Sequence, residues 1–276
     1  MALSFKRLGA STLCFRHSSV AEALPRLRQA GFAWVDLVLI PRYCPHYNLE
    51  SGTADSQAQL AGLLARLGLR VASLNADIGN MAAQAEEQTA LVRRGLKLMH
   101  LAHTLKAGVV TLPCGPACSP AEFEQVAYRV ADTLQRLSPL AEAAGVQLTV
   151  EAPHAGTLCC NSHAAVALLD LAGAGIGCTF DTGHVAAAGE LAVDAALQLK
   201  NRLAHVHLRD ARADDALLTP GDGEVDFPGV IGRLNDFAYR GHVVVELEVH
   251  DPNPDVAGRE LGRARDFLQP YLVDLP

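Results

Sequence analysis

Residues 176–184 read IGCTFDTGH, a short apolar and β-branched run that ends in Asp181 and is followed by Thr182, Gly183 and His184. The pattern predicts a strand with a carboxylate at its C-terminal tip, a turn, and an imidazole in the loop just beyond. An Asp-Thr-Gly turn is common and indicates no function by itself. The same design recurs in VQLTVEAPH (146–154), LAHVHLRD (203–210) and HVVVELE (242–248), where apolar strands end in a carboxylate or an imidazole.

Working outward from this stretch, short apolar runs alternate with longer helical patterns along the whole chain. Strands are expected at 8–15, 32–40, 69–77, 107–115, 146–154, 176–181, 203–210 and 242–248, and helices at 19–31, 54–68, 82–106, 119–145, 162–173, 191–199, 227–239 and about 257–269. Strands that alternate with helices predict a parallel sheet, and eight such units in 276 residues favour one closed (β/α)8 (TIM) barrel domain over 1–276. A dinucleotide-binding fold is disfavoured because no G-x-G-x-x-G follows the first strand.

Composition limits the partners. The formal charge of −7 argues against a nucleic-acid backbone as the partner. No apolar run reaches the length of a membrane span, and MALSFKRLGAST at the start lacks the apolar core of a signal peptide. We therefore expect a cytoplasmic protein without a membrane or nucleic-acid partner, whose seven cysteines are reduced. A homo-oligomer is compatible with the sequence, which does not fix the number of subunits.

The strand tips of the C-terminal half define a candidate metal site. In a (β/α)8 barrel the functional site lies at the C-terminal ends of the strands. Glu151, Asp181, His207 and Glu246 come from four consecutive strands, so their side chains can point to one place. Three carboxylates placed together repel one another unless a cation is present. Three carboxylates and one imidazole suit Mn²⁺, Mg²⁺ or Co²⁺.

Other side chains are expected around this site. His205, His207 and Arg209 share one face of their strand, which places His205 deeper and Arg209 nearer the mouth. The predicted substrate contacts include Arg209 and four further residues: His154 and His184, each three residues beyond a candidate ligand, Arg212 after the seventh strand, and Glu248 at the rim. Tyr43 and His46, in the loop after the second strand, are candidates for part of a lid.

The motifs also carry a family resemblance. E-x-P-H at 151–154, D-T-G-H at 181–184, H-V-H-L-R-D at 205–210, G-D-G-E-V-D-F at 221–227 and Y-R-G-H-V-V-V-E-L-E at 239–248 resemble the xylose isomerase-like barrel superfamily of sugar isomerases, epimerases and dehydratases, most of all its inosose dehydratase branch. The resemblance implies a divalent metal at Glu151, Asp181, His207 and Glu246. It also implies that Glu151 and Glu246 act as an acid–base pair on opposite sides of the substrate.

These expectations lead to a metal-dependent sugar isomerase or epimerase that removes the proton α to a carbonyl through an enediolate. An inosose-type dehydratase using the same enolate is the alternative. Acidic residues beside Gly221 and Gly223 would repel a phosphate, so an unphosphorylated keto-sugar or cyclitol is the expected substrate. The superfamily also contains abasic-site endonucleases, but the tips SLNAD (73–77) and TLPCG (111–115) lack the histidines of a three-zinc centre. A non-catalytic barrel is disfavoured because all four ligand positions are filled.

Overall fold

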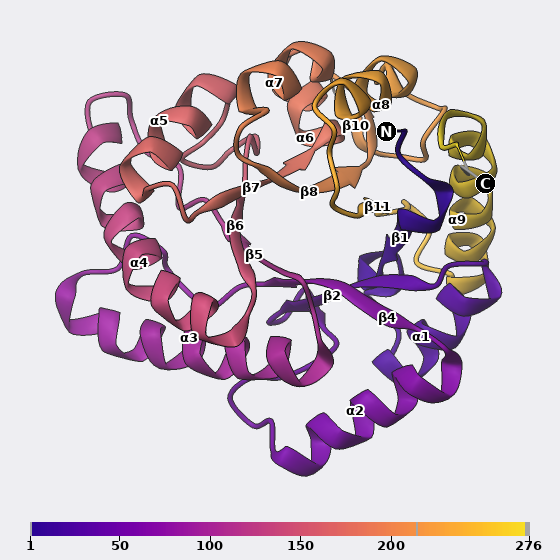
Figure 1. The fold of residues 1–276 in the computed structure, drawn as a ribbon, viewed down its shortest axis with the longest axis horizontal. Coiled ribbons are helices and arrows are strands. Elements are labelled where there is room, and N and C mark those ends of the chain that lie inside the picture. Colours follow the sequence, from indigo (N-terminus) through magenta and orange to yellow (C-terminus); the bar gives the residue numbers. More distant parts are fainter. Residues whose placement is uncertain (1, 214, 274–276) are drawn as a thin grey trace.

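Parallel strands form the centre of the structure. The computed structural model describes residues 2–213 and 215–273, and within them eight parallel strands close into a barrel (Figure 1). These are β1 (Leu8–Ser11), β2 (Trp34–Ile40), β4 (Arg70–Ala76), β5 (Val109–Pro113), β6 (Gln147–Glu151), β7 (Gly177–Asp181), β8 (Leu203–Leu208) and β11 (Val243–Val245). Because β1 pairs with both β2 and β11, the sheet has no open edge there. The predicted (β/α)8 barrel is confirmed; residue 214 of the predicted polar loop and the ends of the span 1–276 lie outside the described residues.

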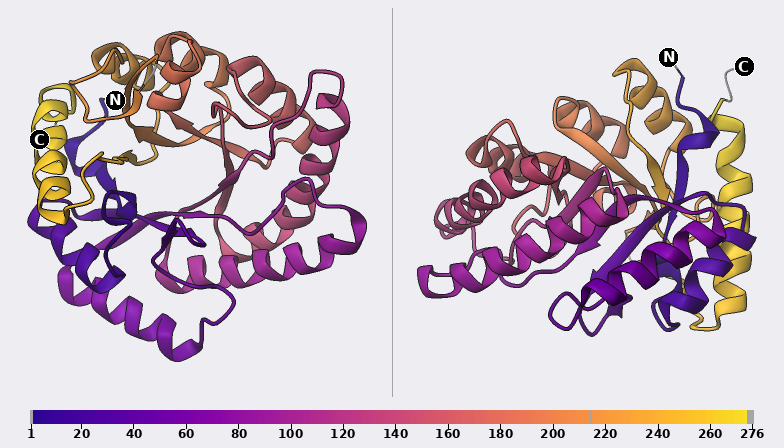
Figure 2. Two further views of the ribbon diagram at one scale, coloured as in Figure 1. Left: turned by 180° about the vertical axis from the view of Figure 1, so that it is seen from behind. Right: turned by 60° about the horizontal axis from the view of Figure 1, so that its bottom comes forward.

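Helices surround the barrel and connect its successive strands, as Figures 1 and 2 show. They are α1 (Val20–Gln29), α2 (Ala54–Leu67), α3 (Ala85–Leu105), α4 (Phe123–Ala144), α5 (Ser162–Ala172), α6 (Thr182–Ala187), α7 (Ala192–Leu199), α8 (Phe227–Asp236) and α9 (Pro254–Leu268), with the 3₁₀ turns η1 (Phe5–Arg7), η2 (Thr12–Phe15) and η3 (Gln269–Tyr271). Their inner faces are apolar, and Leu98, Leu134 and Leu168 are fully buried. In the described part of the chain, no helix is both long and apolar enough to reach across a bilayer.

Local sequence sets the ends of several helices. At the start of α2, the Thr53 side chain accepts a hydrogen bond from Ser56 N and the Ser56 side chain accepts one from Thr53 N, which forms a capping box. α2 and α4 end at Gly68 and Gly145, whose φ angles of 65° and 71° lie in the left-handed region that glycine adopts without strain. These glycines are the helix stops that the sequence predicts.

The interior of the barrel is polar below the candidate site. The hydroxyls of Thr111, Thr149 and Thr179, on β5, β6 and β7, lie 2.7–3.1 Å from one another. Ser73 Oγ on β4 lies 2.9 Å from His205 Nε2 on β8. Barrel interiors are more often filled by branched apolar side chains. Here the hydrogen bonds among these hydroxyls offset the cost of burying them.

All eight strands are shorter than the sequence predicts, and the first and the last show the physical reason. The expected strand 8–15 ends at Ser11, because Ser11 Oγ accepts a hydrogen bond from Leu13 N and caps η2. The expected strand 242–248 is regular only over β11, although Glu246 N still donates to Leu208 O at 3.2 Å. Both strands therefore leave the ladder at the mouth of the barrel, where side chains of the site are needed.

Three connections contain more structure than predicted. The segment after Asp181 was expected to be a turn and a loop, but it forms α6, with Asp181 as its N-cap. The polar loop after β8 contains an antiparallel hairpin of β9 (Asp210–Arg212) and β10 (Asp215–Leu218). A short antiparallel strand, β3 (Cys44–Pro45), also pairs with β2.

Candidate functional site

Four ionisable side chains meet at the C-terminal end of the barrel. Glu151 ends β6, Asp181 ends β7, His207 lies on β8 and Glu246 directly follows β11. His207 Nδ1 is 2.9 Å from Glu151 Oε1, 3.0 Å from Glu246 Oε2 and 3.9 Å from Asp181 Oδ2. One potential ligand atom of each residue lies within 4.8 Å of those of the others. The structure thus brings together all the residues that the sequence suggests as metal ligands, which we call the ligand cluster.

Strand register and one helix cap orient the ligand cluster. Asp181 is paired with His207 across β7 and β8, so their side chains leave the sheet at the same height. Asp181 Oδ1 accepts hydrogen bonds from Gly183 N at 2.8 Å and His184 N at 2.9 Å. These bonds hold the carboxylate at the start of α6 and direct its other oxygen, Oδ2, toward His207 and Arg209.

Arg209 is a buried cation beside the ligand cluster. Its side chain contacts Asp181 through Nε at 3.2 Å, Glu246 through Nη2 at 2.9 Å and Glu248 through Nη1 at 2.7 Å. The residue is only 2% exposed, because it lies below the rim. Each of its nitrogens already meets a carboxylate, so its expected contact with substrate stays a prediction.

The charges in the ligand cluster shift one another's ionisation. Burial alone would lower the pKa of His207, but the charge of Glu246 and the contacts with Asp36, Glu151 and Glu246 outweigh burial and raise it well above its usual value. Burial alone would raise the pKa of Glu246, but His207 and Arg209 hold it well below its usual range. Burial raises the pKa of Asp181 to about 6, with Arg209 opposing the rise and Glu246 and Glu151 adding to it. His207 and Arg209 therefore supply positive charge that balances these acids.

The ligand cluster fits a divalent ion. Ligand atoms about 2.0–2.2 Å from a common ion and at right angles to each other are about 3 Å apart. The separations of 2.9 and 3.0 Å from His207 Nδ1 to the two glutamates match this spacing. A set of three carboxylates and one imidazole is suited to Mn²⁺, Mg²⁺, Co²⁺ or Zn²⁺. A bound ion would also lower the repulsion among the carboxylates.

His154 and His184 form a stacked pair. Their ring centres are 3.6 Å apart and the planes are tilted by 30°. Burial lowers the pKa of His184 well below its usual value, and the positive charge of Arg209 and the neighbouring His154 ring lower it further. His184 is therefore uncharged at neutral pH and can donate or accept one hydrogen bond at each ring nitrogen. The structure brings these two predicted contacts together, and their role toward substrate stays a prediction.

Glu248 ties together three loops at the rim. Glu248 Oε2 accepts hydrogen bonds from Arg16 Nη1 at 2.8 Å and from the Tyr43 hydroxyl. The Arg16 guanidinium also lies 5.0 Å from the centre of the Tyr43 ring. These contacts join the segments that follow β1, β2 and β11. His46, the other expected lid residue, is 5% exposed and faces the backbone oxygens of Phe15 and Ser18, so it anchors the loop from below.

Arg212 lies apart from the other predicted contacts. It is exposed on β9, and its guanidinium donates a hydrogen bond to the backbone oxygen of Asp222. Within the described residues, this contact holds the hairpin to the loop after β10. In the described part of the chain, Arg212 forms no hydrogen bond with the ligand cluster. Its predicted contact with substrate stays a prediction.

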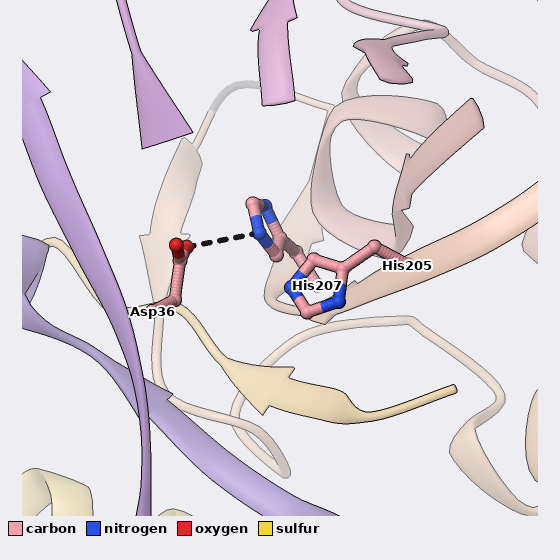
Figure 3. Close-up of side chains that lie close together, drawn as sticks. All are labelled: Asp36, His205 and His207. Atoms are coloured by element: carbon pink, nitrogen blue, oxygen red, sulfur yellow. Dashed lines mark ion pairs between the residues drawn. The ribbon is translucent and has the colours of Figure 1, made fainter. Parts of the chain in front are cut away.

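Two buried carboxylates were given no role by the sequence. Asp36, on β2, lies 3.1 Å from His207 Nε2. Figure 3 draws this ion pair together with the neighbouring His205. The signal was available, because Asp36 interrupts the apolar strand WVDLVLI. Asp210 accepts hydrogen bonds from Gly221 N at 2.8 Å, Gly223 N at 2.9 Å and Val225 N at 3.1 Å, and so organises the loop after β10.

Comparison with known proteins assigns this barrel to a family. A family model described as xylose isomerase-like TIM barrel matches residues 24–267. The chain belongs to the xylose isomerase-like TIM barrel family. Inosose dehydratase from Clostridium perfringens is 32% identical to this member over 142 residues, which are 45% of the chain and 47% of the dehydratase. The chain thus matches about half the length of such curated relatives.

Solved structures share the whole fold of this family member. A crystal structure of IOLI protein with a bound zinc atom superimposes with a TM-score of 0.81 at 17% identity, over 97% of this chain and 99% of that one. D-psicose 3-epimerase with D-tagatose from Clostridium cellulolyticum gives a TM-score of 0.79 at 14% identity, over 97% and 99%. At sequence identities this low, the similarity shows a shared fold alone.

Proposed function

We propose that the protein is a divalent-metal-dependent sugar isomerase or epimerase that removes the proton α to the carbonyl of an unphosphorylated keto-sugar or cyclitol. The observation that carries the proposal is the position of two glutamates at one imidazole. Glu151 and Glu246 come from opposite flanks of the ligand cluster and lie 2.9 and 3.0 Å from His207 Nδ1. A pair of carboxylates beside one ion is what proton transfer on two sides of a substrate requires.

The two glutamates would exchange protons with the substrate. One carboxylate takes the α-proton, and the electrons of the broken C–H bond move toward the carbonyl oxygen to give an enediolate. The ion, held by the ligand cluster, would supply positive charge where that oxygen becomes negative. Return of a proton from the other glutamate to the opposite face, or to the neighbouring carbon, gives the epimer or the isomer. The Glu151 side chain keeps 13% exposure, against 2% for Glu246, and is the more open of the two to substrate.

The surroundings of the ligand cluster favour an uncharged polyol. The uncharged His184, stacked on His154, offers ring nitrogens that suit hydroxyl groups. The backbone N–H groups of Gly221, Gly223 and Val225 could otherwise cradle a phosphate, but they already donate to the Asp210 carboxylate. A phosphate there would have to displace Asp210, which supports an unphosphorylated substrate.

A dehydratase is the second candidate, and the inosose dehydratase relative favours it. Its 32% identity covers about half of either chain, so it supports the reaction class without defining it. The first step is the same in both cases. If the hydroxyl on the carbon β to the carbonyl leaves with a proton from one glutamate, the enolate electrons form a C=C bond and water is released. Isomerisation and dehydration therefore differ in the fate of the enolate.

Proton exchange with solvent tests the proposal. The protein is incubated in D₂O with a panel of keto-sugars, their phosphates and inososes, without metal and with Mn²⁺, Mg²⁺ or Co²⁺, and the products are analysed by NMR. We expect Mn²⁺-dependent deuterium incorporation at the α-carbon, without loss of water for an isomerase or epimerase and with formation of an enone or diketone for a dehydratase.

Matched variants complete this test. Glu151→Gln and Glu246→Gln should each lower the exchange rate by about 10²-fold or more, whereas Glu124→Gln, at an exposed position on α4, should leave it unchanged. If no substrate on the panel exchanges with any divalent metal, or if only sugar phosphates react, the proposed function is wrong.

A further inference from the structure

Asp36 is a carboxylate in an unusual place. It lies in the middle of β2 with no exposed surface, between Val35 and Leu37, which are also fully buried. An ionised carboxylate in such surroundings costs several kcal/mol unless a partner compensates it. Its side chain points across the barrel toward His207, as Figure 3 shows. The question is therefore what this partnership does.

The contact joins Asp36 to the rear of the His207 ring. Asp36 Oδ2 is 3.1 Å from His207 Nε2. The opposite nitrogen, Nδ1, is the one that lies among Glu151, Glu246 and Asp181. Within the described residues, neither His207 Nε2 nor the Asp36 oxygens have a partner with full hydrogen-bond geometry, so this 3.1 Å ion pair is the polar contact that the two side chains make with each other. The two ring nitrogens of His207 therefore face two different environments, a single carboxylate behind and the ligand cluster in front.

We propose that Asp36 is a positioning residue that keeps the proton of His207 on Nε2 and thereby leaves the lone pair of Nδ1 free for a metal ion. A neutral imidazole carries one N–H, and the nitrogen that binds a metal must be the other one. A carboxylate that accepts from the rear N–H selects this tautomer, holds the ring plane and makes the front nitrogen a stronger ligand. The inference rests on the metal site of the proposed function and adds a fifth residue, from β2, to its design.

A second ion beneath the first is the competing explanation. Potential ligand atoms of Asp36, His205 and His207 also lie within 4.8 Å of one another. All three residues have no exposed surface, however, and His205 Nε2 already meets Ser73 Oγ at 2.9 Å. An ion bound by Asp36 and Nε2 would also require His207 to lose its protons from both nitrogens when Nδ1 holds the upper ion. The ion pair of Asp36 with a protonated Nε2 needs no such loss, and the 3.1 Å distance favours it.

Metal affinity of matched variants tests the role of Asp36. Chelator-treated wild type, Asp36→Asn and Thr111→Val are titrated with Mn²⁺ by calorimetry. Asp36→Asn keeps the volume of the side chain and removes its charge, and we expect about 10- to 100-fold weaker binding. Thr111→Val removes another fully buried polar group from the barrel, where Thr111 bonds to Thr179 and Thr149. This control should bind Mn²⁺ within about twofold of wild type.

A measurement on the wild type covers the case in which the Asp36 variant does not fold. In ¹⁵N-histidine-labelled protein loaded with Mg²⁺, the His207 resonances, assigned through their loss in His207→Gln, should show a protonated Nε2 and an unprotonated Nδ1. A proton on Nδ1, or Mn²⁺ affinity equal to wild type in Asp36→Asn, would overturn the role of Asp36 while the metal site stands. Two Mn²⁺ ions per wild-type chain, falling to one in Asp36→Asn, would replace it with the deeper ion site. If the wild type binds no divalent ion, the proposed metal site itself is wrong and the inference fails with it.

Discussion

At the scale of single residues, His207 is the centre of the site. Among the histidines of the described residues, it is the one that contacts carboxylates on both ring nitrogens, with Asp36 on one side and Glu151 and Glu246 on the other. Removing one partner of such a buried charge network leaves the others uncompensated, which typically costs about 3–5 kcal/mol. His207 is therefore a cation in the metal-free protein, and it would have to become neutral to bind the proposed ion.

This double role predicts that metal affinity falls with acid. His207 has a raised pKa, so it holds a proton in the metal-free protein at neutral pH, and that proton must leave Nδ1 before an ion binds. Asp181, with its pKa raised to about 6, must also be ionised. The association constant for Mn²⁺ should therefore rise about tenfold per pH unit above pH 6, and more steeply below it.

Calorimetric titrations between pH 5 and 8, in buffers of different ionisation enthalpy, measure both the affinity and the protons released. We expect close to one proton released per Mn²⁺ at pH 7. Affinity that is constant between pH 6 and 8, with no proton release, would show that His207 is not protonated in the metal-free state. As an internal check, the Thr111→Val variant should reproduce the wild-type pH profile.

At the scale of elements, Asp181 serves one helix and one site at once. Its Oδ1 caps α6 through Gly183 N and His184 N, while its Oδ2 faces the ligand cluster. Gly183 is needed at this junction, because a Cβ there would lie 2.6 Å from Arg209 Cγ. The short helix α6 therefore sets the positions of the Asp181 carboxylate, of the buried Arg209 and of His184 together.

Two substitutions of Asp181 separate these roles. Asp181→Asn keeps an oxygen that can cap α6 but removes the charge, so it should weaken Mn²⁺ binding strongly while the barrel stays folded. Asp181→Ala removes the cap as well and should lose about 0.5–2 kcal/mol more stability than Asp181→Asn in the presence of a chelator. Urea unfolding followed by circular dichroism, together with Mn²⁺ titration, distinguishes the two. Equal stabilities of Asn and Ala would show that the cap contributes little, and wild-type affinity in Asp181→Asn would remove Asp181 from the ligand set.

The elements also show what sequence could and could not predict. Apolar runs between glycine-terminated helices were enough to place all eight barrel strands within the described residues, and residues at strand tips were enough to suggest the ligand cluster. The end of β1 at Ser11 and the helix α6 were missed, because both depend on a side chain that caps the next turn. The pattern was equally compatible with a longer strand after Ser11 and with a loop after Asp181. The partnership of Asp36 with His207 was missed for another reason. It joins β2 to β8 across the barrel, and a contact of that range depends on closure of the sheet.

At the scale of the whole molecule, the barrel concentrates unlike charges in its interior. Five ionisable residues inside the barrel are each at most 2% exposed: Asp36, Asp181, His207, Arg209 and Glu246. They lie on β2, β7 and β8, or directly after β8 and β11. In the metal-free state the negative charges of the buried carboxylates are balanced by Arg209 and by the protons that His207 and the carboxylates bind. An ion that binds the folded barrel but has no site in the unfolded chain adds its binding free energy to stability.

Global stability should therefore depend on divalent metal. At a concentration about 100 times the dissociation constant, Mn²⁺ should stabilise the folded protein by about 2.7 kcal/mol, which corresponds to a rise of about 5–10 °C in Tm for a chain of this size. Differential scanning calorimetry with excess chelator and then with Mn²⁺ measures this. Glu246→Gln, which loses one ligand charge, should show less than half of the shift, whereas Glu124→Gln on α4 should show all of it. An unchanged Tm in wild type would mean that the buried charges are balanced without an ion and that the ligand cluster serves the fold alone. An equal shift in Glu246→Gln would mean that the stabilising ion binds without Glu246.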